Sequence, residues 1–317
     1  MAGPERVALT REVRRIELDA RRLLDSHALG AYQSVFRGHG IEFSEVRSYL
    51  PGDPFQAIDW KVTARMRRPF VKRFVEEREL TVMLVLDVSA STNFGTRGKL
   101  KSRLAVEVAS VLILAAMRSQ DRVGLLLFTD RCEKLVRPLR GRNRMQRLLY
   151  DLLAFRPKGR GTDLEGAIDT AARVLSVRSI VFVISDFAVP DVAGDTAEGN
   201  GDGHRRGLSR ALTGLAHRHE VVAIDVRDPA EEALPEAGLL EVEDPETGRR
   251  VVVDLSDRRV RETLTRRTVA EDERLAATVR RAGVEWITLC TDRPYVVDLH
   301  TFFAARAKRK TRRRRIR

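Results

Sequence analysis

The stretch that decides the fold is TVMLVLDVS, residues 81–89. It is almost continuously apolar, whereas a strand with one face in water would alternate apolar and polar residues. Strands of parallel sheets have this composition because helices cover both of their faces. The segment therefore predicts a central, fully buried strand that ends at a polar turn.

Helices and further apolar strands alternate after this segment. An amphipathic helix is predicted over about 101–118, and the strand RVGLLLF follows it, with a short hairpin partner at 132–136. The later elements are helices around 145–152 and 164–175, a strand at 179–185, a helix at 208–217, a strand at 220–226, a charged helix at about 257–282 and a strand at 286–290. This order predicts an α/β fold, doubly wound around a mainly parallel sheet with helices on both faces.

Composition divides the chain into five segments. These are an N-terminal helix at 1–36, a strand- and turn-rich segment at 37–78, the α/β domain at 79–291, a C-terminal helix at 292–307 and a basic tail at 308–317. Inside the α/β domain, Gly/Asp-rich residues 190–207 predict a flexible loop, and residues 229–254 predict a hairpin insertion, LLEVE and RRVVVDL joined across DPETG. We interpret PGDPFQAIDW, with Asp53, Asp59 and Trp60, as a bridge between the N-terminal segment and the sheet.

Composition also excludes several classes of protein. With 43% hydrophobic and 32% charged residues, the chain has the material for a globular core. No apolar run approaches the roughly 20 residues of a membrane-spanning helix. The N-terminus lacks the apolar segment of a secretory signal, which predicts a cytoplasmic protein. Cys132 and Cys290 form neither a disulfide framework nor a zinc pattern.

The basic charge is concentrated at the C-terminus. The chain carries a net charge of +13, and eight basic side chains lie in its last ten residues, KRKTRRRRIR. They are Lys308, Arg309, Lys310, Arg312, Arg313, Arg314, Arg315 and Arg317. Such a tail attracts nucleic acid, an anionic membrane surface or an acidic protein face. Binding to one of these through the tail is one alternative function.

Polar side chains follow three elements of the predicted domain. Asp87, Ser89 and Ser91 end the first strand, Thr162 lies in the glycine-flanked loop GRGTD, and Asp186 follows the strand at 179–185. Ligands of open α/β sheets bind at the carboxyl ends of the strands, so these side chains are expected to meet at one edge. Two carboxylates and three hydroxyls are hard oxygen donors, which suit Mg²⁺ far better than zinc.

Structural and catalytic alternatives remain at this edge. Asp87 and the serines could simply satisfy backbone amides in a strand-to-helix turn, and Asp163 is both a possible secondary ligand and a helix cap. Residues 94–102, FGTRGKLKS, lack the spacing of a phosphate-binding loop. The sequence presents no catalytic histidine and no GxSxG motif. A binding site is therefore favoured, with a Mg²⁺-dependent phosphoryl hydrolase as the alternative.

Several blocks of sequence carry a family resemblance. The segment RGHGIEFSEVRSYLPGDPFQAIDWKVTARMRRPFVKRFVEEREL, with the later blocks DVSASTNFG, DRVGLLLF, GTDLEGA and ISDF, resembles the bacterial domain-of-unknown-function family 58 over about Arg37 to Asp186. The DxSxS pattern, with the later Thr and Asp, resembles the metal-ion-dependent adhesion site of von Willebrand factor A domains. Two departures stand out: Thr92 replaces the usual methionine, and Gln56-Ala57 stands where arginine usually follows PGD.

The resemblance implies a von Willebrand factor A-like fold and a role for each site residue. Ser89 and Ser91 would bind Mg²⁺, or Mn²⁺ or Ca²⁺, through their hydroxyls, and Thr162 would bind it directly or through water. Asp87 and Asp186 would hold the water molecules bound to the metal. Because the direct ligands are mostly neutral, a carboxylate from a partner protein could complete the coordination. The resemblance thus implies a non-enzymatic adaptor, acting with a MoxR-type AAA+ ATPase in complex assembly or maturation.

Overall fold

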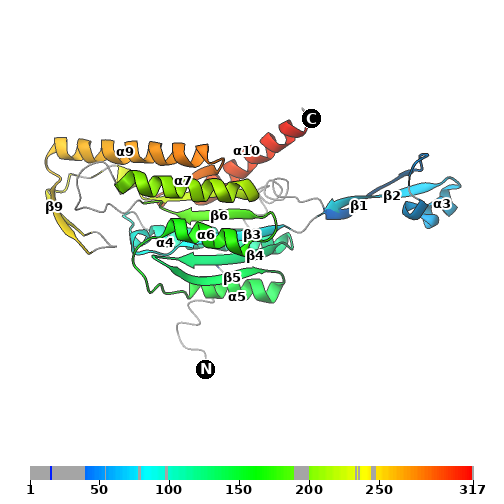
Figure 1. Cartoon of the computed structure of the whole chain (residues 1–317), viewed down its shortest axis with the longest axis horizontal. Coiled ribbons are helices and arrows are strands. Elements are labelled where there is room, and N and C mark those ends of the chain that lie inside the picture. Colours follow the sequence, from blue (N-terminus) through cyan, green and yellow to red (C-terminus); the bar gives the residue numbers. More distant parts are fainter. Residues whose placement is uncertain are drawn as a thin grey trace, which may run out of the picture.

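A six-stranded sheet forms the centre of the molecule (Figure 1). The computed structural model describes residues 15, 40–53, 55–77, 80–96, 99–188, 200–232, 234, 236–243 and 248–315. The strands of the sheet are β3 (Thr81–Asp87), β4 (Arg122–Phe128), β5 (Cys132–Leu139), β6 (Ile180–Ser185), β7 (Glu220–Arg227) and β10 (Glu285–Cys290). Their order is β10-β7-β6-β3-β4-β5; β5 pairs antiparallel with β4 and all other neighbours pair parallel. The predicted mainly parallel sheet is confirmed.

Helices cover both faces of this sheet because successive strand residues point in opposite directions. Along β3, Leu84 and Leu86 belong to one buried cluster, and Met83 and Val85 belong to the other. The first cluster is completed by α4 (Lys101–Arg118), α5 (Arg142–Leu153) and α10 (Tyr295–Arg315), the second by α6 (Leu164–Val174), α7 (Asn200–Arg218) and α9 (Arg258–Arg281). The predicted three-layer α/β architecture is confirmed.

The strand order reverses beside β3, and this reversal positions the candidate site. From β3 the chain continues to β4 and β5 on one side, and from β6 it continues to β7 and β10 on the other. The helix after β3 packs on one face of the sheet, and the helix after β6 packs on the opposite face. The loops at the carboxyl ends of β3 and β6 therefore diverge, which is where open α/β sheets bind their ligands.

Helix α7 begins earlier than the sequence predicts. Residues 200–207, assigned to a flexible loop with 190–199, are helical, while residues 189–199 lie outside the described part of the chain. The Gly/Asp-rich composition favours a loop, but packing against α6 overrides it. Gly207 is buried, and a Cβ atom there would meet the carboxylate of Glu165 on α6, so this part of α7 lies against α6.

The C-terminal helix extends into the segment predicted as a separate basic tail. Helix α10 runs to Arg315 instead of ending at 307. Arg306 donates to Glu220 at 2.6 Å, and Arg309 donates to Glu285 at 3.2 Å. These contacts fix the helix against the first residues of β7 and β10, so it continues past the predicted boundary.

A separate unit precedes the sheet. Strands β1 (Gly40–Ser48) and β2 (Phe70–Glu77) pair antiparallel, and η2 (Phe55–Ala57) and α3 (Trp60–Met66) lie between them in the chain. We call residues 40–53 and 55–77 the arm. Figure 1 shows the arm beyond one end of the sheet instead of packed on it.

The aspartates of PGDPFQAIDW shape the arm itself. Both oxygens of Asp53 accept from the Arg47 guanidinium, at 2.7 and 2.8 Å. Asp59 caps α3 by accepting hydrogen bonds from the amides of Lys61 and Val62. The predicted bridge to the sheet is therefore wrong, because both carboxylates are used within the turn and helix of the arm.

The remaining elements are short. They are η3 (Ala90–Asn93), α8 (Pro229–Glu232) and the antiparallel hairpin of β8 (Leu239–Glu243) and β9 (Arg250–Asp254). The N-terminal helix predicted at 1–36 lies outside the described residues except for Arg15, which is helical and donates to Glu107 at 3.0 Å. Among the helices that the structure describes, none combines the length and apolar character needed to cross a bilayer.

Candidate metal centre

The turn after β3 is organised by the carboxylate of Asp87. This side chain is 1% exposed, and its Oδ1 accepts a hydrogen bond from the Ser89 amide at 2.9 Å. The hydroxyl oxygens of Ser89 and Ser91 lie 3.0 Å apart, and either one can donate to the other. Thr92, within the short helix η3, donates to the Ser89 carbonyl at 2.7 Å. The two serines thus present neighbouring oxygens directly beside a buried carboxylate.

Strand β6 contributes to the same edge. The Ser185 hydroxyl donates to Asp87 Oδ2 at 2.6 Å, which ties the end of β6 to the end of β3. Asp186 follows and is 8% exposed. The structure therefore brings Asp87 and Asp186 together, as predicted from their positions after separate strands.

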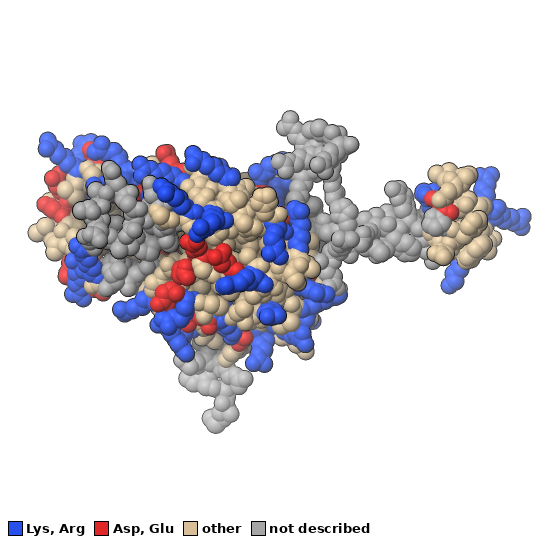
Figure 2. Space-filling model, in the orientation of Figure 1, with Lys and Arg blue, Asp and Glu red and all other residues tan. Residues whose placement is uncertain are grey.

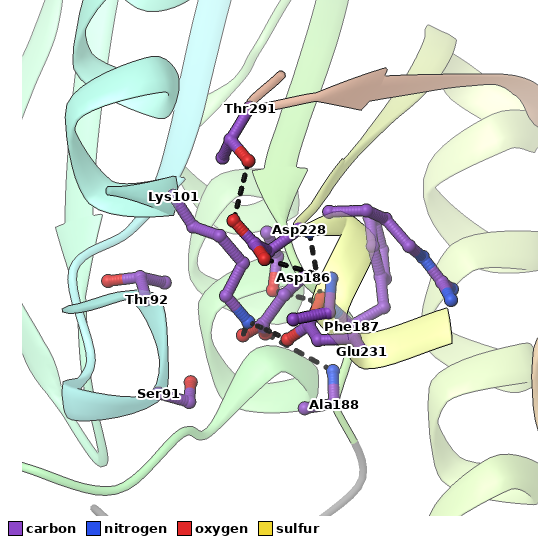
Figure 3. Close-up of polar contacts among 12 residues, drawn as sticks. Ser91, Thr92, Lys101, Asp186, Phe187, Ala188, Asp228, Glu231 and Thr291 are labelled. Carbon is purple, nitrogen blue, oxygen red and sulfur yellow. Dashed lines mark hydrogen bonds and ion pairs between the residues drawn. The ribbon is translucent and has the colours of Figure 1, made fainter. Parts of the chain in front are cut away.

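A buried lysine shares this edge, and the sequence did not predict it. The ammonium of Lys101 donates to Asp186 Oδ2 at 2.7 Å and to Glu231 Oε1 at 2.6 Å (Figure 3). The lysine is 3% exposed and is the first residue of α4. Burial favours its neutral form, but the carboxylates of Asp186 and Glu231 outweigh burial and raise the pKa of Lys101. A cation at the amino end of an apolar helix opposes the helix dipole, a signal that could have marked this residue.

The glycine-flanked loop at 159–163 lies against the turn after β3, residues 88–92, which we call the serine turn. The Ala90 amide donates to the Arg160 carbonyl at 2.9 Å, and Thr162, two residues further on, is half-buried. Asp163 caps α6 by accepting from the Gly166 amide at 2.9 Å. The structure thus brings the loop of Thr162 to the site, and it uses Asp163 as a helix cap.

Glu133, which the sequence did not predict, holds this loop in place. Its carboxylate Oε1 accepts from the Gly159 amide at 2.6 Å and from the Thr129 hydroxyl at 3.0 Å. A Cβ atom at Gly159 would lie 2.2 Å from Thr129 Oγ1, so the close approach requires glycine.

Electrostatics at this edge favour an added cation. Burial, followed by the negative charge of Asp186, raises the pKa of Asp87 to about 7, although hydrogen bonds from Ser185 and Ser89 act in the opposite direction. Within the described part of the chain, no group of three or more His, Cys, Asp and Glu side chains could hold a metal ion. A cation here would therefore depend on hydroxyl oxygens as well as carboxylates, a donor set that fits a hard divalent ion.

In the absence of divalent cations, the Asp87 carboxyl is expected to make the protein less stable as the pH rises. Its folded pKa of about 7 exceeds the ordinary 3.8, so the stability that this carboxyl contributes is fully present below about pH 4 and is lost as the pH rises through 7. Asp87→Asn removes the titration at nearly constant size. Urea unfolding in chelator should therefore show that, between about pH 5 and pH 8, the free energy of unfolding decreases less for the variant than for the wild type. Equal pH dependence in both proteins would contradict the raised pKa.

Two other buried aspartates have structural roles. Asp121 is buried and accepts from the Leu80 amide at 3.2 Å. Asp225 accepts from Arg227 Nε at 2.7 Å, and the same guanidinium bonds Asp272 of α9. These contacts tie β7 to its covering helix.

Comparisons with solved structures show likeness to other α/β proteins. BatB from Bacteroides thetaiotaomicron matches with a TM-score of 0.41 and 16% identity, covering 74% of this chain and 99% of that chain. A von Willebrand factor type A structure from Catenulispora acidiphila matches with a TM-score of 0.37 and 9% identity, covering 74% and 44% of the two chains. Both likenesses are distant, so the fold assignment rests on the strand order and pairing described above.

Comparisons of sequence identify the family. The family model described as "Protein of unknown function DUF58" matches residues 45–274. The chain is also 33% identical over 303 residues to "Uncharacterized protein Rv1480" of Mycobacterium tuberculosis, which covers 95% of this chain and 90% of that protein. The resemblance inferred from the sequence blocks is therefore confirmed, and this chain belongs to the DUF58 family.

Proposed function

We propose that this chain is a divalent-cation-dependent protein-docking module. The observation that carries the proposal is the convergence of Asp87, Ser89, Ser91 and Asp186 at one edge, with the Thr162 loop bonded against the turn that holds the two serines. Asp87 is buried next to a second carboxylate, an arrangement that a cation would relieve. The site thus has the oxygen donors and the excess negative charge that suit a hard metal ion.

Each side chain has a proposed role at such an ion. The hydroxyls of Ser89, Ser91 and Thr162 would hold Mg²⁺, Mn²⁺ or Ca²⁺, and Asp87 and Asp186 would orient bound water. When bound, the ion supplies Lewis acidity that attracts a further oxygen ligand. The hydrogen bonds to Asp87 keep the serine turn in one conformation, so the hydroxyls stay positioned for binding. The partner would contribute an acidic side chain.

The partner that we propose to test first is a MoxR-type AAA+ ATPase, as the family resemblance suggests. Chelator-treated protein should bind Mn²⁺ in a titration followed by electron paramagnetic resonance, with a Kd of roughly 1 mM or tighter. Binding to the ATPase should require the divalent ion and disappear with chelator. Failure to bind Mn²⁺, Mg²⁺ or Ca²⁺ would overturn the proposal. Cation-dependent hydrolysis of a phosphate ester would instead favour the alternative, a phosphoryl hydrolase.

Lys101→Met is expected to tighten Mn²⁺ binding at least tenfold. The ammonium occupies Asp186 Oδ2, and it repels any cation bound nearby. Removing it frees the carboxylate and removes the repulsion. The matched control is Lys99→Met, a lysine two residues away that pairs with Glu107 instead. Unchanged affinity in the Lys101 variant, with a native circular dichroism spectrum, would show that the lysine does not compete with the metal.

A further inference from the structure

Large apolar side chains stand in solvent at the arm tip, which we define as residues 49–53 and 55–69. Leu50, Phe55, Trp60 and Met66 are 59%, 72%, 67% and 59% exposed. Aromatic residues with an apolar body are enriched where proteins meet partners or membrane interfaces. A concentration of four large apolar side chains, two of them aromatic, on a small unit therefore marks a docking surface.

The tip is folded, so the exposure of these side chains is a property of its structure. Asp53 holds the turn through Arg47, and the Asp59 cap starts α3. The Phe70 amide donates to the Thr63 hydroxyl at 3.0 Å, which ties the helix to β2. Asp53, Asp59 and Thr63 thus bond within the arm, while the large apolar side chains remain exposed.

The charge of the tip selects an anionic partner. Lys61, Arg65, Arg67 and Arg68 are exposed, and the sequence from 60 to 75 contains no acidic residue. Figure 2 shows Lys and Arg side chains around the uncharged surface of the arm. Cations beside exposed aromatic and aliphatic groups are the combination that binds acidic lipid headgroups while apolar groups enter the interface.

The apolar side chains of the tip come from three different elements. They come from a turn, from η2 and from the two ends of α3. Trp60 and Met66 are six positions apart, so at about 100° per residue their directions differ by roughly 120° around the helix axis. A fluid anionic lipid interface can adapt to this spread of directions, and its charge complements the cations of the tip. We propose that the arm tip inserts its apolar side chains into an anionic membrane surface.

The Arg-rich end of α10 lies at the same edge of the sheet as the arm. Strand β2 ends at Glu77, shortly before β3 begins at Thr81, so the arm connects to the edge of the sheet where the parallel strands begin, the amino edge. Arg306 and Arg309 pair with the first residues of β7 and β10, at that same edge. Figure 1 shows the C-terminal end of α10 on the side of the molecule where the arm projects. The candidate metal centre lies at the opposite, carboxyl edge, so a membrane and a protein partner could be bound together.

The test uses full-length protein and vesicles of phosphatidylglycerol and phosphatidylcholine, with pure phosphatidylcholine vesicles as the neutral control. Sedimentation should show binding to the anionic vesicles only, and Phe55→Ala with Trp60→Ala should weaken it at least tenfold. The matched control is Leu239→Ala with Val252→Ala, two side chains of the β8–β9 hairpin that are 75% and 65% exposed. The control should bind like the wild type.

Tryptophan fluorescence adds a second readout, because the chain contains two tryptophans. Trp60 is exposed, whereas Trp286 packs against Phe187 with 5.1 Å between ring centroids. Anionic vesicles should shift the emission to the blue in the wild type and leave Trp60→Phe unshifted, although that variant still sediments.

Three outcomes would overturn the proposal. One is no binding to anionic vesicles. Another is binding that the arm substitutions leave unchanged and that truncation of 308–317 abolishes, which would assign it to the end of α10 alone. The third is arm-dependent binding of duplex DNA without binding to vesicles, which would assign the surface to nucleic acid.

Discussion

Replacing Ser89 and Ser91 together by alanine is expected to weaken Mn²⁺ binding at least 100-fold. Both hydroxyls are proposed to contact the ion directly, and loss of even a residue that only supports a ligand typically costs 10- to 100-fold. The fold should survive, because Asp87 keeps its hydrogen bonds from the Ser89 amide and the Ser185 hydroxyl. The free energy of unfolding should change by no more than about 2 kcal/mol.

The matched control for this pair is Ser110→Ala. Like Ser89, Ser110 is fully buried, but its hydroxyl donates to the Val106 carbonyl within α4, away from the site. Its Mn²⁺ affinity should equal that of the wild type by titration. If the double variant binds Mn²⁺ normally while the wild type also binds, the cation lies elsewhere and the assignment of the serine turn is wrong.

The sheet was predictable because its signal is local. TVMLVLD and IVFVIS, the sequences of β3 and β6, are buried at every position, and a run of six or seven residues with both faces covered suits a central parallel strand. The serine turn was predictable for the same reason, since Asp87, Ser89 and Ser91 fall within five residues. Strand order then brings Asp186 to the same edge without further information.

Lys101 was not predictable from its neighbours. It lies in a basic stretch, GKLKSR, which has the composition of a solvated surface. Its burial depends on Asp186, 85 residues away, and on Glu231, 130 residues away. Ion pairs over such sequence distances leave no local pattern. The sequence therefore located the candidate metal centre but missed the cation built into it.

The predicted boundaries of α7 and α10 were wrong for a related reason. Composition favoured a loop before 208 and a separate tail after 307, whereas α7 and α10 continue through both positions. In α7 Gly207 lies beside Glu165 of α6, and in α10 Arg309, beyond the predicted boundary, donates to Glu285, 24 residues away. Tertiary packing outweighs the local preference of glycine and of clustered like charges.

A single aspartate joins three of the loops at the carboxyl edge. Asp228 is fully buried and accepts from the Thr96 amide at 3.0 Å and the Thr96 hydroxyl at 2.5 Å. It also accepts from the Thr291 hydroxyl at 2.6 Å and the Ala230 amide at 3.0 Å (Figure 3). These bonds connect the segment after β3 with those after β7 and β10. The carboxylate thereby helps to position α8, whose Glu231 accepts a hydrogen bond from Lys101.

Asp228→Ala is therefore expected to lower the free energy of unfolding by about 4 kcal/mol at neutral pH, because several buried donors lose their acceptor and each unpaired group costs roughly 1–3 kcal/mol. Burial alone would raise the pKa of Asp228, but the hydrogen bonds from Thr291, Thr96 and Ala230 lower it to about 2. Its stabilising contribution is present above the ordinary value of 3.8 and is lost as the pH falls through 2. Urea unfolding at about pH 7 and pH 3 should thus show a smaller difference in the free energy of unfolding between the wild type and the variant at the lower pH.

The control is Asp254→Ala, which changes an exposed aspartate that accepts from Ser256 and should alter the free energy of unfolding by less than about 1 kcal/mol. A loss of similar size in both variants would show that Asp228 does not hold these loops together.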